Sequence, residues 1–143
     1  MDIKYNVSKI KGSKEEIVKD AVSVEEPLEM RLKYKKNGKI ETQNISITMR
    51  TPGNDEDLIR GFLFNERIIE NMDEIDSIQH IGDPVGDYNL HNVIEATINK
   101  TDNLDIGKLK RNFVTNSSCG VCGKTSLDSI EAVSYTHLRA HET

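Results

Sequence analysis

Residues 25–49 contain the pattern that most constrains the fold, because apolar and polar side chains alternate on both sides of an Asn-Gly pair. Asn37-Gly38 readily supplies the positive φ angles of a two-residue hairpin turn. Alternation with a period of two is typical of a half-buried strand, and Pro27 stands at a strand start, where a missing N–H is tolerated. The side chains expected to share one face are Leu28, Met30, Leu32 and Tyr34, then Ile45, Ile47 and Met49 in the return strand. The sequence therefore predicts a β-hairpin with one apolar face.

A helix is expected directly after this hairpin. Pro52-Gly53 predicts a turn, and Asn54 or Asp55 is a natural N-cap. The acidic residues 55–57 suit the positive end of the helix dipole. The apolar pairs spaced by four residues are Leu58 with Phe62 and Ile59 with Leu63. Residues 50–53 can also be interpreted as a phosphate-binding turn, but the three successive acidic residues favour packing of strand, turn and helix.

The remaining segments complete an α+β pattern. Strands are expected around residues 3–7, 75–81 and 93–98, and helices over residues 104–113 and from Thr125 or Ser126 onward. The charged residues 12–20 predict a loop or a short helical turn, and residues 82–92 predict a loop because Gly, Pro, Asp and Asn follow one another closely. His80 and His91 have no Ser or Cys neighbour in the sequence, and the sequence assigns them no role.

Composition excludes several classes of protein. The chain has 143 residues, of which 36% are hydrophobic, so one packed domain is possible and wholesale disorder is not expected. The net charge of −5 argues against a primary role in binding nucleic acid, which needs a basic surface. No apolar run is long enough to span a membrane, and the first residues contain no apolar secretory core. We therefore expect a cytoplasmic protein that binds neither nucleic acid nor membrane.

The two cysteines are the most informative chemical feature, because Cys119 and Cys122 form a single C-x-x-C motif. Three interpretations are open. A zinc site would add His137 and His141, which follow after fourteen residues, although the segment between lacks the aromatic core residue of a small finger. A thiol–disulfide oxidoreductase would normally place the first thiol at a helix start, whereas glycines separate this motif from the next expected helix.

Sulfur carriage is the third interpretation. A persulfide carrier needs an exposed nucleophilic cysteine on a flexible segment, because that cysteine must enter the sites of two different proteins. The residues S-S-C-G-V-C-G-K place small polar residues before Cys119 and glycines within and after the motif. Cys122 could assist release by attacking the persulfide. Four basic residues flank this loop and could attract an anionic cofactor or form a solvated face: Lys108, Lys110, Arg111 and Lys124.

Five sequence blocks together resemble one known family. They are E-E-P-L-E-M-R-L at residues 25–32, M-R-T-P-G-N-D-E-D-L at 49–58, G-F-L-F-N-E-R-I-I at 61–69, R-N-F at 111–113 and S-S-C-G-V-C-G-K at 117–124. Their order and spacing are similar to those of the formate dehydrogenase accessory sulfurtransferases, the FdhD/NarQ family. Arg67 departs from the glycine that is usual in the family at that position.

The resemblance implies a cytoplasmic sulfurtransferase. Members of that family accept persulfide sulfur from a cysteine desulfurase and pass it to the bis-molybdopterin guanine dinucleotide cofactor of formate dehydrogenase. The persulfide-bearing cysteine of the family corresponds to Cys119 and the second cysteine to Cys122, with no metal bound by the protein itself. The family also implies a homodimer.

The resemblance further implies a division of the chain. Residues 1–114 would form a mixed N-terminal α/β subdomain, and residues 115–132 the CxxC loop and the truncated start of a cytidine-deaminase-like α/β domain. The family's second half, with its cofactor-binding segment, has no counterpart, so we expect a fragment that is not competent alone. Residues 133–143 resemble a translated sequencing-adapter read-through and are expected to be a non-native tail; the alternative is a frayed C-terminal helix.

Overall fold

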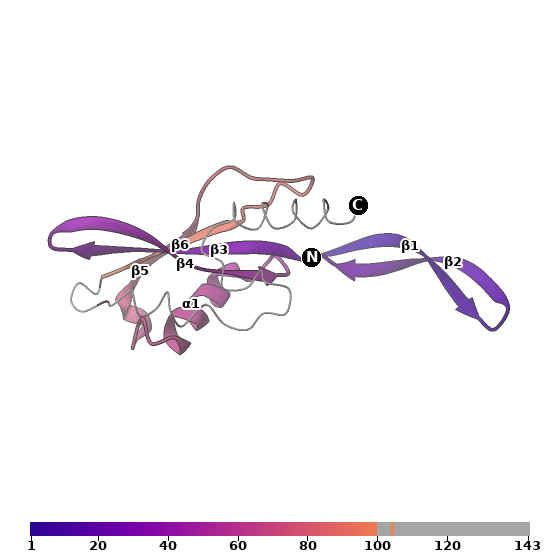
Figure 1. Ribbon diagram of the computed structural model, residues 1–143, viewed down its shortest axis with the longest axis horizontal. Helices are drawn as coiled ribbons and strands as arrows, with labels where there is room; N and C mark the ends of the chain where they lie inside the picture. Colours follow the sequence, from indigo (N-terminus) through magenta and orange to yellow (C-terminus); the bar gives the residue numbers. More distant parts are fainter. Residues whose placement is uncertain (100–103, 105–143) are drawn as a thin grey trace, which may run out of the picture.

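The computed structural model describes residues 1–99 and residue 104 (Figure 1). In this part of the chain the elements follow one another as β1 (Asp2–Lys11), β2 (Lys14–Ser23), β3 (Glu26–Lys36), β4 (Lys39–Arg50), α1 (Asp55–Asn65), the 3-10 helix η1 (Met72–Glu74), β5 (Ile75–His80) and β6 (Val93–Ile98). The fold is mixed α+β, as predicted. The predicted helices after residue 104, the deaminase-like segment and the C-terminal tail lie outside the described residues.

The strands form two sheets. β1 and β2 pair with each other, and the second sheet has the order β4-β3-β6-β5. β3 and β6 are parallel, whereas β3–β4 and β5–β6 are antiparallel. Figure 1 shows α1 against one side of the larger sheet and the β1–β2 hairpin projecting away from it. Within the described residues, no helix has the length and apolarity needed to cross a bilayer.

The prediction of a loop or helical turn at residues 12–20 was wrong, because most of this segment belongs to strand β2. Gly12-Ser13 makes a tight turn, and β2 returns along β1 with Val18 opposite Val7 and Val22 opposite Ile3. The charged residues that indicated a loop lie on an exposed two-stranded ribbon, so their side chains remain in water on both of its faces. Cross-strand pairing of β-branched residues stabilises the strand despite its charge.

The β3–β4 hairpin confirms the Asn-Gly prediction and adds a bulge. Asn37 and Gly38 have φ angles of 51° and 78°, as the twist-matched two-residue turn requires. The register shifts between Met30 and Arg31, which leaves Ile45 as an extra residue in β4. Ile45 packs in the core, whereas Ile47 pairs with Glu29 and is buried outside that cluster. The expectation that all apolar residues of the return strand share one face was therefore wrong.

The core lies between α1 and the sheet. Of the two apolar pairs predicted in the helix, Ile59 and Leu63 are fully buried, whereas Phe62 packs at the edge of the core and Leu58 is 37% exposed. The sheet side of the core comprises Leu28, Met30, Leu32, Tyr34, Ile45, Ile94, Ala96 and Ile98, and Ile68 and Ile69 close it after the helix. Burial of these side chains is the main stabilising term. It fixes the end of β4 and the start of α1 against each other.

Candidate functional site

The residues selected from the sequence for chemistry lie outside the described part of the chain. This applies to Cys119 and Cys122, to the alternative zinc ligands His137 and His141, and to the basic residues that flank the thiol loop. Within the described residues, no three side chains of the metal-ligating types come together. The described fold instead contains a polar centre at the β4–α1 junction.

Arg50, the last residue of β4, is the hub of this centre. Its Nε and Nη2 donate to the two carboxylate oxygens of Asp55 at 3.0 and 3.1 Å. Its Nη1 donates to the side-chain oxygen of Asn92 at 3.0 Å and to the backbone oxygen of Glu26 at 3.3 Å. A further bond from Nη2 reaches the backbone oxygen of His91 at 3.1 Å. These five bonds account for all five N–H donors of a guanidinium group, so Arg50 joins four segments of the fold.

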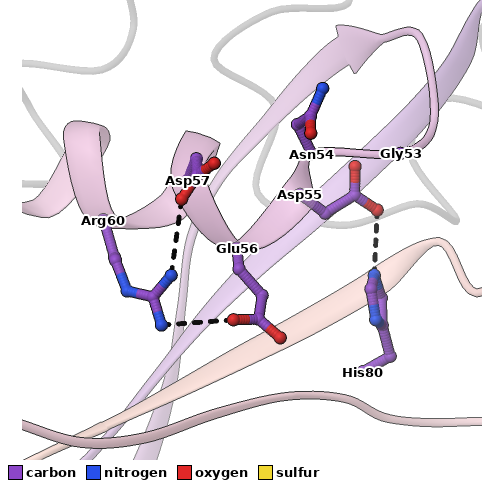
Figure 2. A pocket seen from close by; sticks show the side chains of 7 residues that line it. All are labelled: Gly53, Asn54, Asp55, Glu56, Asp57, Arg60 and His80. Carbon is purple, nitrogen blue, oxygen red and sulfur yellow. Dashed lines mark hydrogen bonds and ion pairs between the residues drawn. The ribbon is translucent and has the colours of Figure 1, made fainter.

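His80 completes the centre from the end of β5. Its Nε2 lies 2.8 Å from the carboxylate of Asp55, and its ring centroid lies 6.0 Å from that of His91. Figure 2 shows Asp55 turned from the start of α1 toward His80, while Arg60 points to Glu56 and Asp57 on the helix surface. These side chains line an open cleft of about 320 Å³ with Gly53 and Asn54.

The local sequence explains how Arg50 and Asp55 meet. The turn at residues 51–54 reverses the chain, and Gly53 has a φ of 139°, in the region that favours glycine. Asn54 is the N-cap, as predicted, but its side chain makes no capping hydrogen bond. Asp55, the first residue of the helix, forms an ion pair with Arg50, five residues earlier in the chain.

The pairing decides between the two interpretations of residues 50–53. Arg50 and Asp55 are 8% and 6% exposed, and every N–H of the guanidinium is used inside the protein. The guanidinium has no donor left for a phosphate, and the Asp55 carboxylate stands at the helix start, where its charge would repel one. Packing of strand, turn and helix is therefore the correct interpretation.

The sequence could reveal only half of this centre. Arg50 and Asp55 are close in the chain and joined by a turn motif. His80 lies 25 residues from Asp55 and Asn92 lies 42 residues from Arg50, so no spacing rule connects them. The sequence assigned no role to His80 and His91, and the structure places both beside the Arg50–Asp55 pair.

The ion pair shifts the titration of Asp55. Burial by itself raises the pKa of this carboxyl, but hydrogen bonds from Arg50 and His80 and their charges outweigh it, so the pKa lies below its ordinary value of 3.8. A carboxyl whose pKa is lowered by folding stabilises the protein at every pH above the unfolded-state pKa. That contribution is lost as the pH falls through the folded-state pKa.

We expect Asp55→Asn to remove part of the acid dependence of stability. In the unchanged chain, the free energy of unfolding should fall as the pH drops below about 4, the ordinary range of an Asp carboxyl, and go on falling until Asp55 of the folded protein takes up a proton at its lower pKa. The Asn variant should be less stable at neutral pH and show a shallower decline in acid. Urea unfolding from pH 6 to pH 2.5 measures this decline. Asp57→Asn, whose side chain is 81% exposed, is the matched control and should keep the full decline; equal curves for both variants would contradict the prediction.

Comparison with known proteins assigns the chain to a family. The model of the FdhD/NarQ family matches residues 24–142. Among curated proteins, the chain is 38% identical over 124 residues to the "Sulfur carrier protein FdhD" of Sulfurisphaera tokodaii, covering 87% of this chain and 42% of that protein. It is 42% identical over 112 residues to the protein of the same name from Streptomyces avermitilis, covering 78% of this chain and 37% of the relative.

The matches extend over only part of each relative. The chain spans about two fifths of the length of these curated relatives. No solved structure matches it. The family match nevertheless covers most of the chain, including the C-x-x-C motif and the residues of the Arg50 centre. The chain therefore belongs to the FdhD/NarQ family.

Proposed function

We propose that the chain carries sulfur as a persulfide on Cys119, with Cys122 assisting its release. The observation that carries the proposal is the C-x-x-C motif, flanked by small residues and glycines, in a member of a family whose curated relatives are named sulfur carrier proteins. Small residues and glycines favour an accessible thiol, and the neighbouring Lys124 favours its thiolate form.

The loading step is a transfer between thiols. The Cys119 thiolate attacks the outer, sulfane sulfur of a persulfide on a cysteine desulfurase. The sulfur–sulfur bond of the donor breaks, the desulfurase cysteine leaves as a thiolate, and a new sulfur–sulfur bond forms on Cys119. No net oxidation occurs, because one persulfide and one thiolate exchange a single sulfur atom.

Release can use the second cysteine. The Cys122 thiolate attacks the Cys119 sulfur of the persulfide, which forms a Cys119–Cys122 disulfide and expels the outer sulfur as sulfide. A dithiol reductant then restores both thiols.

We propose that the acceptor of this sulfur is the bis-molybdopterin guanine dinucleotide cofactor of formate dehydrogenase, as substrate. Delivery is proposed for the whole protein, as a homodimer in the cytoplasm, and loading is the step to test on this chain.

Mass spectrometry tests the loading step directly. After incubation with a cysteine desulfurase and cysteine, the chain should gain the mass of one sulfur atom, and a dithiol reductant should remove it. A chain that stays folded and gains no sulfur would overturn the proposal. Stoichiometric bound zinc would favour the metal-site alternative instead, and turnover of disulfide substrates without a desulfurase would favour the oxidoreductase.

A further inference from the structure

The tip of the β3–β4 hairpin concentrates positive charge on an acidic chain. Lys35, Lys36 and Lys39 surround the Asn37-Gly38 turn, and the register places Lys36 directly opposite Lys39. Like charges directly opposite each other destabilise a hairpin. Within residues 1–99, none of these three lysines forms an ion pair. The hairpin therefore bears an electrostatic cost that its own contacts do not offset.

The β1–β2 hairpin provides an internal comparison. It also has two lysines opposite each other beside its turn, Lys11 and Lys14. There, however, Lys9 lies opposite Glu16, and Glu15 accepts a hydrogen bond from Ser8, so carboxylates stand close to the tip. Near the β3–β4 tip the first carboxylate is Glu41, which accepts a hydrogen bond from Tyr34 at 3.0 Å. The two tips thus differ in their net local charge.

A groove lies at the base of the β3–β4 tip. Its volume is about 280 Å³, and the residues that line it include Lys33, Tyr34, Lys35, Ile40, Thr97 and Ile98. Asp76 and Asn99 also line it, and the Asn99 side-chain amide donates a hydrogen bond to the Asp76 carboxylate at 3.0 Å. Ile40 is 69% exposed and lies opposite Lys35, so an apolar side chain stands among the lysines.

On its β6 side, the end of β3 beside this groove has no paired strand among the described residues. The pairing of β3 with β6 ends at Lys33 and Thr97, so residues 34–36 of β3 have no strand neighbour on that side among the described strands. Figure 1 shows the hairpin continuing past the end of the sheet. An extended peptide can bind such an open strand edge through its backbone, while adjacent pockets select its side chains.

We propose that the β3–β4 tip and its groove bind an extended acidic segment of a partner protein, with an aliphatic side chain of that segment in the groove. Charge complementarity selects an acidic ligand. The exposed Ile40 and the apolar side chains that line the groove favour a protein over a nucleic acid, because a phosphate backbone would leave them uncovered. The net charge of −5 also repels nucleic acid. The proposal goes beyond sulfur carriage and does not depend on Cys119.

Fluorescence anisotropy of the full chain with defined probes tests this surface. The probe is a short labelled peptide of alternating glutamate and leucine. We expect it to bind at low salt and to weaken as salt rises. Changing the three tip lysines together, Lys35→Glu, Lys36→Glu and Lys39→Glu, should weaken binding by about tenfold or more, and Ile40→Ser by severalfold. A glutamate–serine peptide should bind less tightly than the glutamate–leucine peptide.

The other hairpin supplies the matched control. The triple change Lys9→Glu, Lys11→Glu and Lys14→Glu alters the net charge by the same amount as the tip variant but leaves the groove untouched, and it should change binding by less than about twofold. All changed residues are exposed, so circular dichroism should show an unchanged fold. The proposal is overturned if the glutamate–leucine peptide does not bind, if the control weakens binding as much as the tip variant, or if a single-stranded oligonucleotide binds more tightly at the same residues.

Discussion

Cys119→Ser is expected to abolish the gain of one sulfur atom after incubation with a cysteine desulfurase and cysteine. The hydroxyl of serine does not ionise near neutral pH and cannot form the sulfur–sulfur bond that holds the transferred atom. Cys122→Ser should still gain the sulfur, because the attacking thiolate remains. Intact-protein mass spectrometry before and after treatment with a dithiol reductant distinguishes the two variants.

The release step provides a second readout for the same pair. Without Cys122, the intramolecular attack that expels sulfide is lost, so the Cys122→Ser persulfide should persist longer in the absence of added thiol. The assignment of Cys119 would be wrong if Cys119→Ser still gained sulfur while Cys122→Ser did not. Equal loss in both variants would instead indicate that the two thiols act as a unit.

Arg50→Met is expected to cost about 3–5 kcal/mol of folding free energy, because it leaves the buried Asp55 carboxylate without its main partner. The same change removes the donors from the backbone oxygens of Glu26 and His91 and from the Asn92 side chain. Small domains are stable by only about 5–15 kcal/mol, so much of the chain should unfold at moderate temperature. Urea unfolding followed by circular dichroism measures the loss.

Two further variants separate the ion pair from general effects. Arg60→Met removes an exposed arginine that pairs with Glu56 at 3.1 Å, and it should cost less than about 1 kcal/mol. Arg50→Lys retains the charge but lacks the planar fork that contacts both oxygens of Asp55, so it should fall between the two. If Arg50→Met is no more destabilising than Arg60→Met, the centre does not hold the junction together.

The Arg50 centre also has a consequence for the chemistry of this chain. It uses all donors of Arg50 and both oxygens of Asp55 internally, so its role is to position segments. It holds the start of β3, the end of β4, the start of α1 and both ends of the β5–β6 connection. We therefore expect variants at this centre to change stability first and sulfur loading only through unfolding.

Sequence patterns predicted the elements whose causes are local. Asn37-Gly38 supplies the positive φ angles of its turn, and the four-residue spacing of Ile59 and Leu63 builds the buried helix face. The C-x-x-C motif and the five family blocks could likewise be recognised from the sequence alone. Where prediction failed, as in β2, the charged side chains suggested a loop although pairing with β1 stabilises a strand.

The β3–β4 hairpin, the helix after it and membership of the FdhD/NarQ family follow from the sequence alone, because each depends on residues that are neighbours in the chain or on a motif of fixed spacing. Three features became visible only in the folded structure: His80 and Asn92 join Arg50 and Asp55, a bulge separates Ile45 from Ile47, and a groove opens beside the lysine tip. These features depend on contacts between residues tens of positions apart. Such contacts form only when the burial of the common core has brought the strands together.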